Sequence, residues 1–124
     1  MQGAGPVGLA AVAVAREAGA ARIIVIGGPE HRLERARRFG ADVTISIDTA
    51  DRKQQVLAAT EGGFGADVVM ECVGHPSAVP EGREYCRDGA KMLVLGQCGD
   101  AGPAPINPHI ITRRQLQLYG SWGF

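Results

Sequence analysis

Short apolar runs alternate along the chain with amphipathic segments that end at glycines. Between the runs, apolar residues recur at helical spacing, and this pattern predicts that strands and helices alternate. The runs that predict strands are 23–26, 43–47, 66–73, 91–95 and 115–119, and the helices are expected over 7–18, 29–39, 52–60, 77–87 and 108–112. Such alternation indicates an α/β fold with a doubly wound parallel sheet and right-handed crossovers.

Particular residues mark the expected ends of these elements. Gly19 and Gly40 are expected to close the first two helices as left-handed caps. Asp51 is expected to cap the third helix at its start, and Gly89 to end the fourth. The run at 23–26 is apolar without interruption, which is typical of a strand buried on both faces.

The composition restricts the classes of protein that the sequence fits. A length of 124 residues predicts one domain, residues 1–124, and 45% hydrophobic residues suffice for its core. The 13 basic and 13 acidic residues cancel, which argues against nucleic acid or an anionic membrane as a partner. No apolar run approaches the roughly 18 residues of a membrane span, and the start does not have the pattern of a signal peptide.

The three cysteines, Cys72, Cys86 and Cys98, are odd in number and widely spaced. This pattern predicts neither a disulfide framework nor a zinc knuckle, and it favours a reducing, cytoplasmic location. We interpret the three thiols as packing residues rather than as ligands or nucleophiles.

The most informative motif is a glycine-rich turn that leads into the first predicted helix. Its glycines are Gly3, Gly5 and Gly8, with Pro6 and Val7 between the last two. The first glycine permits a sharp turn, the second lets a pyrophosphate approach the backbone, and the third lets the helix pack close to the sheet. The motif therefore predicts a dinucleotide site, provided that a strand precedes it.

Only Met1 and Gln2 precede this turn, so the first strand of the sheet is expected to be largely missing. In a doubly wound sheet that strand is central. The sequence is accordingly expected to be a fragment that begins just inside its first strand.

Glycines also follow three of the predicted strands, at Gly27 and Gly28, at Gly74 and at Gly96. Ligands of doubly wound sheets bind across the carboxyl ends of the strands, so these positions are expected to lie along one rim with the opening turn. The alternative is that each glycine only makes a local turn.

Taken in order, several motifs resemble the cofactor-binding, Rossmann-like domain of the zinc-dependent alcohol dehydrogenases, in the medium-chain dehydrogenase/reductase superfamily. The resemblance covers essentially the whole chain. The motifs that carry it are Gly3-Ala4-Gly5-Pro6-Val7-Gly8, Arg37-Arg38-Phe39-Gly40-Ala41-Asp42, Gly65-Ala66-Asp67-Val68-Val69, Cys72-Val73-Gly74, Leu93-Val94-Leu95-Gly96 and Leu118-Tyr119-Gly120-Ser121.

The resemblance implies that Gly3, Gly5, Pro6, Val7 and Gly8 hold the pyrophosphate of NAD or NADP. The family often has an acidic residue for the adenosine ribose where this chain has Gly27, which is followed by Gly28. Without that carboxylate a 2′-phosphate is not repelled, and Arg32 could pair with either a ribose hydroxyl or the phosphate, so the preference leans slightly to NADP. Alternatively, Arg32 is only a solvated helix residue.

Further roles follow from the same resemblance. Four residues are expected to line the adenosine side: Cys72, Val73, Gly74 and His75. Three residues are expected to meet the nicotinamide carboxamide: Leu95, Gly96 and Gln97. Residues 121–123 would close the nicotinamide end.

In this family the zinc ligands and the substrate pocket belong mainly to the other, N-terminal domain. We therefore expect no catalytic or metal-binding residue within the 124 residues, and no alcohol oxidation by the chain alone. With that domain, the parent enzyme would transfer a hydride between an alcohol and nicotinamide. The alternatives are a zinc-independent quinone or enoyl reductase and a non-catalytic nucleotide-binding module. The resemblance also implies a homodimer or tetramer through the edge at 106–119.

Overall fold

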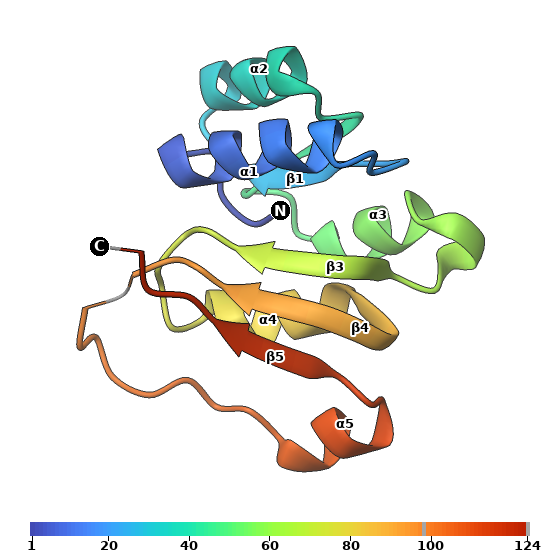
Figure 1. The fold of residues 1–124 in the computed structure, drawn as a ribbon, viewed down its shortest axis with the longest axis vertical. Helices are drawn as coiled ribbons and strands as arrows, with labels where there is room; N and C mark the ends of the chain where they lie inside the picture. Colours follow the sequence, from blue (N-terminus) through green and yellow to red (C-terminus); the bar gives the residue numbers. More distant parts are fainter. Residues whose placement is uncertain (98, 124) are drawn as a thin grey trace.

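A computed structural model describes residues 1–97 and 99–123, and it contains α-helices and parallel strands in alternation (Figure 1). The helices are α1 (Pro6–Glu17), α2 (Glu30–Phe39), α3 (Arg52–Ala58), α4 (Ala78–Tyr85) and α5 (Pro108–Arg113), with a 3-10 turn η1 (Glu61–Gly63). The strands are β1 (Ile24–Gly27), β2 (Val43–Ser46), β3 (Ala66–Glu71), β4 (Cys86–Val94) and β5 (Gln117–Gly120). Among the described residues, no helix is long and apolar enough to cross a membrane. Cys98 lies outside the described residues.

All strand pairs are parallel. β1 pairs with β2, and β4 pairs with β3 on one side and β5 on the other. Gln2 makes parallel bridges to Ile26 of β1 and to Glu71 of β3, so it occupies the position between the two groups of strands. The order across the sheet is therefore β2, β1, Gln2, β3, β4, β5, and the predicted doubly wound α/β fold is confirmed.

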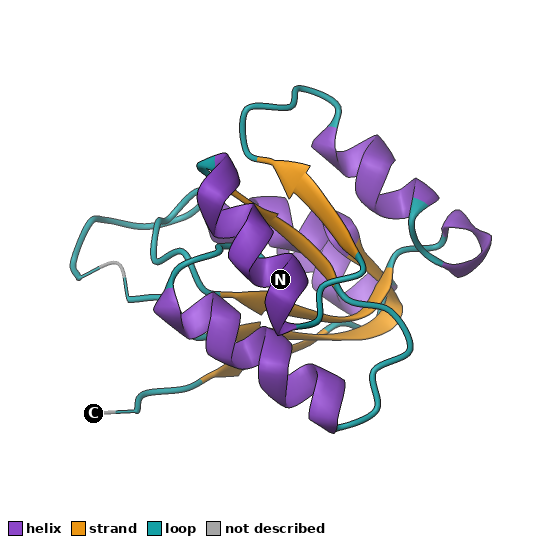
Figure 2. Ribbon diagram, turned by 90° about the horizontal axis from the view of Figure 1, so that it is seen from above, coloured by secondary structure: helices purple, strands orange, loops and turns teal. Residues whose placement is uncertain are grey.

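Helices cover both faces of this sheet (Figure 2), and each face has its own apolar core. Successive residues of β1 face opposite sides: Val25 belongs to the core under α1 and α2, and Ile26 to the core under α3 and α4. The first core contains Ala4, Val12, Ile23, Val25, Leu33 and Ala36. The second contains Ile26, Ile45, Val56, Val69, Tyr85, Cys86, Ala90, Met92 and Leu116. Burial on both faces explains the unbroken apolar run at 23–26.

The predicted closures of the first two helices are confirmed. Gly40 is the C-cap of α2 in the left-handed region, with φ of 117°, and its N–H bonds to the end of the helix. Gly19, just beyond the C-cap of α1, also has a positive φ of 83°. These backbone angles strain a residue with a Cβ, so the glycines fix both helix ends.

Two other boundary predictions are wrong. α4 ends at Tyr85 and the buried Cys86 already pairs with Ala66, so Gly89 lies within β4, in an irregular stretch before the regular register resumes at Lys91. Asp51 precedes α3 but its side chain does not cap it. Side-chain capping requires an extended backbone, whereas Asp51 has φ −96° and ψ 30°. Its carboxylate accepts a hydrogen bond from the Gln55 side chain instead, at 3.0 Å.

Met1 and Gln2 lie at the centre of the sheet, between β1 and β3. Met1 and Gln2 fill only the carboxyl-terminal part of the space between β1 and β3. Beside them a cavity of about 1060 Å³ reaches the amino ends of both strands, where residues such as Ile24 and Val68 line it. This cavity lies at the opposite end of the sheet from the glycine-rich turn.

The amino group of Met1 lies inside this gap and donates to the Ile24 carbonyl at 2.8 Å. Burial lowers its pKa from 8.0 to about 6, because the charged ammonium loses hydration there. Between pH 8 and 6 the unfolded chain therefore binds a proton at this group that the folded chain does not.

We predict that the free energy of unfolding of the 124-residue chain falls as the pH is lowered from 8 to 6, by about 2 kcal/mol from this group. Urea unfolding at a series of pH values measures it. An N-terminally acetylated chain, which has no titrating amine, serves as the control and is expected to lack this part of the slope. Equal pH dependence in the two chains would contradict the prediction.

Candidate functional site

The opening turn connects Gln2 to α1 over the carboxyl end of β1. Gly3 has a φ of +98°, and its N–H donates to the Ile26 carbonyl at 2.8 Å. A Cβ on Gly8, in the first turn of α1, would lie 2.0 Å from the Gly3 carbonyl oxygen. The roles predicted for these two glycines, a sharp turn and a close approach of the helix, therefore correspond to contacts in the fold.

Gly5 differs from its neighbours in the turn. It is the N-cap of α1 with an ordinary φ of −80°, and a Cβ built on it would meet no atom within 4 Å. Pro6 is the first helical residue, and it and Val7 are exposed. The N-terminal amides of a twelve-residue helix thus face open space beside Gly5, which is the arrangement that binds phosphate groups.

A second segment of the rim follows β3 and lies directly against the turn. A Cβ on Gly3 would lie 3.1 Å from the Cys72 carbonyl oxygen. Gly74 has a φ of +76°, and a Cβ on it would lie 2.6 Å from the Gln97 carbonyl oxygen. The structure therefore brings the turn, residues 72–74 and residues 96–97 together, as the sequence predicted.

The third segment follows β4 and opens onto a shallow hollow of about 630 Å³. Gly96 and Gln97 line the hollow together with Ser121 and Trp122, which come from the end of the chain. Leu95 lies directly after β4, and its N–H donates to the Glu71 carbonyl at 2.9 Å. The expected nicotinamide end, including residues 121–122, is thus assembled from two distant parts of the sequence.

The expected adenosine end has a packing feature that the sequence did not reveal. Gly27 is buried at the end of β1, and a Cβ on it would lie 3.0 Å from the Ala4 Cβ. Close packing against the turn is therefore a second reason for glycine at this position, besides cofactor preference. Gly28 lies next to Ile47, and Arg32 is exposed in the first turn of α2.

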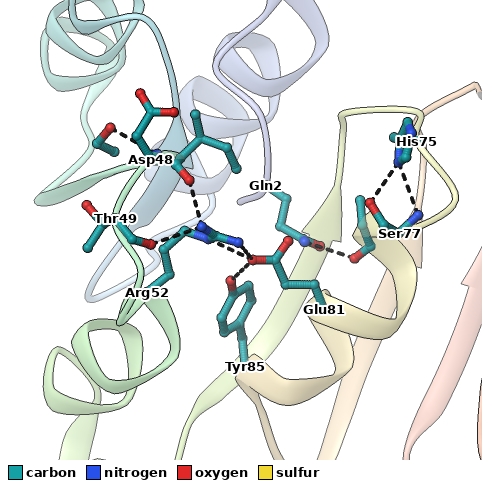
Figure 3. Close-up of polar contacts among 11 residues, drawn as sticks. Gln2, Asp48, Thr49, Arg52, His75, Ser77, Glu81 and Tyr85 are labelled. Atoms are coloured by element: carbon teal, nitrogen blue, oxygen red, sulfur yellow. Dashed lines mark hydrogen bonds and ion pairs between the residues drawn. The ribbon is translucent and has the colours of Figure 1, made fainter.

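His75 and Cys72 have surroundings that define their chemistry. The His75 Nδ1 atom lies 2.7 Å from the Ser77 hydroxyl and accepts the Ser77 N–H at 3.2 Å (Figure 3), so the Nε2 atom carries the proton in the neutral ring. The Cys72 thiol is partly buried, and burial raises its pKa to about 11. It is therefore a neutral thiol at pH 7, which agrees with a packing role.

Sequence reasoning missed two polar groups near the rim. Arg52 at the start of α3 bridges the loop after β2 to α4: it donates to the Ile47 carbonyl at 2.6 Å and to Glu81 at 2.8 Å (Figure 3). Glu71, the last residue of β3, is completely buried. The signal available for Glu71 was a carboxylate in the middle of the stretch 68–73, whose other residues are apolar.

Within residues 1–97 and 99–123, the His, Cys, Asp and Glu side chains form no group of three that could hold a metal ion. The groups that converge on the rim are backbone amides and carbonyls, with few side chains among them. Such a surface suits an elongated ligand with phosphates and hydrogen-bonding groups.

Comparison with known proteins identifies relatives over the whole chain. 5-exo-hydroxycamphor dehydrogenase from Pseudomonas putida is 39% identical over 123 residues, covering 98% of this chain and 34% of that protein. L-threonine 3-dehydrogenase from Bacillus subtilis is 45% identical over 93 residues, covering 75% of this chain and 26% of that protein. The chain thus spans about a third or less of the length of these relatives.

Solved structures agree with the architecture. An alcohol dehydrogenase from Thermotoga maritima superposes with a TM-score of 0.91 at 35% identity, over 96% of this chain and 33% of that one. A zinc-binding dehydrogenase from Sinorhizobium meliloti, bound to NADP, superposes with a TM-score of 0.91 at 28% identity, over 98% of this chain and 36% of that one. An alcohol dehydrogenase from Escherichia coli, complexed with NADH, superposes with a TM-score of 0.86 at 25% identity, over 97% of this chain and 34% of that one.

The family model described as zinc-binding dehydrogenase matches residues 6–124. This family is NAD(P)-dependent, and the match begins at Pro6, within the glycine-rich turn, and includes every later segment of the rim. The chain belongs to the zinc-binding dehydrogenase family.

Proposed function

We propose that the chain binds a nicotinamide dinucleotide along the glycine rim and is the cofactor domain of an alcohol dehydrogenase-like oxidoreductase. The observation that carries this proposal is Gly5. Its φ is ordinary and the space around its missing Cβ is empty, so the fold itself does not require glycine there. A pyrophosphate against the N-terminal amides of α1 does require it, because a Cβ would occupy part of that space.

The rest of the dinucleotide would lie along the rim on both sides of Gly5. Gly3, Pro6, Val7 and Gly8 would frame the pyrophosphate. The adenosine would lie towards Gly27, Gly28 and Arg32, with Cys72, Val73, Gly74 and His75 on its other side. Leu95, Gly96 and Gln97 would meet the carboxamide, above the hollow that Trp122 lines.

When bound, the nicotinamide supplies the atom that accepts or donates a hydride. The contribution of this chain is to bind and orient the dinucleotide, with backbone groups fixed by the sheet. We propose that a separate domain of a longer protein supplies the substrate pocket and zinc ligands. The alternative parent is a zinc-independent quinone or enoyl reductase, and the sequence encoded upstream, with or without cysteine and histidine ligands, would decide between them.

We also propose that the chain assembles through β5. This strand pairs with β4 on one side, and its residues are exposed, Leu118 by 40% and Tyr119 by 48%. An open apolar strand edge is a site for pairing with a second copy, giving a homodimer or a tetramer through the segment 106–119. Light scattering would measure the oligomeric state, and a monomer at micromolar concentration would contradict assembly through β5.

We also propose that the protein is located in the cytoplasm.

We predict that Gly5→Ala folds normally but binds dinucleotide at least about tenfold more weakly, because only the ligand contacts the new Cβ. Its free energy of unfolding should change by about 1 kcal/mol or less. The matched variant is Gly8→Ala, whose Cβ would overlap the Gly3 carbonyl oxygen and should destabilise the fold itself.

Calorimetric titration with NAD and NADP, with urea unfolding in parallel, measures both effects. Equal binding by the Gly5→Ala variant and the natural chain would contradict the proposed pyrophosphate position. If neither dinucleotide binds to the natural chain, the proposed function is wrong.

A second prediction concerns the choice between the two cofactors. If Arg32 pairs with the 2′-phosphate, Arg32→Ala should weaken NADP binding by about tenfold and change NAD binding by less than about twofold. Arg35→Ala, on the same exposed helix, is the control and should change neither. Equal effects of Arg32→Ala on NAD and NADP would contradict this assignment.

A further inference from the structure

A buried carboxylate lies directly beneath the rim, at the end of β3. Glu71 has no exposed surface, and it ends a strand that lies between Gln2 and β4 near the middle of the sheet. Burial of a carboxylate is costly unless its oxygens accept hydrogen bonds. The bonds that Glu71 makes therefore indicate what it does in the fold.

The side chain and the backbone of Glu71 hold two different loops. Its Oε1 atom accepts the N–H of Val73 at 2.6 Å and the N–H of Gly74 at 2.8 Å. Its backbone carbonyl accepts the N–H groups of Leu95 and Gly96, each at 2.9 Å. Glu71 thus fixes two segments at the same point: the turn at 73–74, on the expected adenosine side, and residues 95–96, on the expected nicotinamide side.

The second oxygen fills the space between these turns. A Cβ on Gly96 would lie 2.6 Å from the Oε2 atom and 2.2 Å from the Gly74 nitrogen. Oε2 has no hydrogen-bond partner among the residues that the structure describes. Glu71 therefore holds the turn at 73–74 through one carboxylate oxygen, and we call this contact the Glu71 clamp. The contact depends on a side chain long enough to fold back to the amides of Val73 and Gly74.

We propose that Glu71 is a positioning residue of the dinucleotide site, which keeps the turn at 73–74 and the segment at 95–97 in register so that their backbone groups line one rim. This inference rests on the proposed function. Glu71 itself is buried under the two loops and acts through them, without touching the ligand. Losing the acceptor would leave the Val73 and Gly74 amides unpaired and free the turn to move.

Two conservative variants separate the effect of side-chain length at position 71 from the effect of its negative charge. Glu71→Gln retains the length of the side chain and one carbonyl oxygen for the two amides, but has no charge. Glu71→Asp retains a carboxylate but is one methylene shorter, so with the backbone in place its oxygens cannot occupy the position of the natural Oε1 atom between the two amides. Glu61→Asp, at an exposed position before β3, is the matched control.

We expect amide hydrogen exchange at Val73 and Gly74, in the chain without dinucleotide, to be at least about tenfold faster in Glu71→Asp and close to the natural rate in Glu71→Gln. Dinucleotide dissociation constants should follow the same order, with a rise of about tenfold for Glu71→Asp and less than about threefold for Glu71→Gln. Circular dichroism establishes that each variant is folded.

Natural exchange rates and affinity in Glu71→Asp would overturn the proposal, as would a Glu71→Gln variant that is impaired as strongly as Glu71→Asp. If the natural chain binds no dinucleotide, the proposed function fails, and the exchange rates alone then decide whether Glu71 holds the loops. If Glu71→Asp does not fold, amide hydrogen exchange at Val73 and Gly74 in Glu71→Gln decides the question. Rates equal to those of the natural chain support the proposal, and faster rates overturn it.

Discussion

The two halves of the sheet are joined by the backbone of three residues, Met1, Gln2 and Gly3. On one side, the Ile26 N–H donates to the Met1 carbonyl at 2.9 Å and the Gly3 N–H donates to the Ile26 carbonyl at 2.8 Å. On the other side, the Gln2 N–H donates to the carbonyl of Met70 in β3 at 2.9 Å, and the N–H of Cys72, just after β3, donates to the Gln2 carbonyl at 2.9 Å. The rim that we propose as the cofactor site spans both halves, so its geometry depends on these bonds, together with the apolar core that both halves share and the Arg52–Glu81 pair between α3 and α4.

The site itself is built mainly from backbone atoms in close contact. A Cβ would collide with Gln97 at Gly74 and with Glu71 at Gly96, and at Gly3, whose φ is positive, it would lie in tight contact with the Cys72 carbonyl. Each glycine therefore has a packing reason, and its presence alone does not indicate a ligand. Gly5 differs from these three glycines: its φ is ordinary and a Cβ built on it would meet no atom within 4 Å, so packing does not explain a glycine there, whereas the proposed pyrophosphate would.

Much of the fold could be predicted from local signals. The apolar runs, the helical spacing and the left-handed glycines at 19 and 40 all concern neighbouring residues, and the structure confirms them. The two boundary failures have different causes. Cys86 enters β4 early because the distant Ala66 pairs with it. Asp51 does not cap α3 for a local reason, because its backbone is not extended and its carboxylate accepts a bond from Gln55. The packing of Gly27 on Ala4 and the clamp at Glu71 could not be predicted either, since both depend on which loops meet at the rim.

The central claim is that an NAD(P) molecule lies along the glycine rim with its pyrophosphate at Gly5. Titration of isotope-labelled chain with NADP and NAD, followed through the backbone amide resonances, tests it most directly. We expect shifts to concentrate at Gly3, Gly5 and Gly8, at residues 73–75 and at residues 96–97, and to saturate with one dinucleotide. Shifts that are absent at millimolar dinucleotide, or that concentrate around the cavity between the amino ends of β1 and β3, would contradict it.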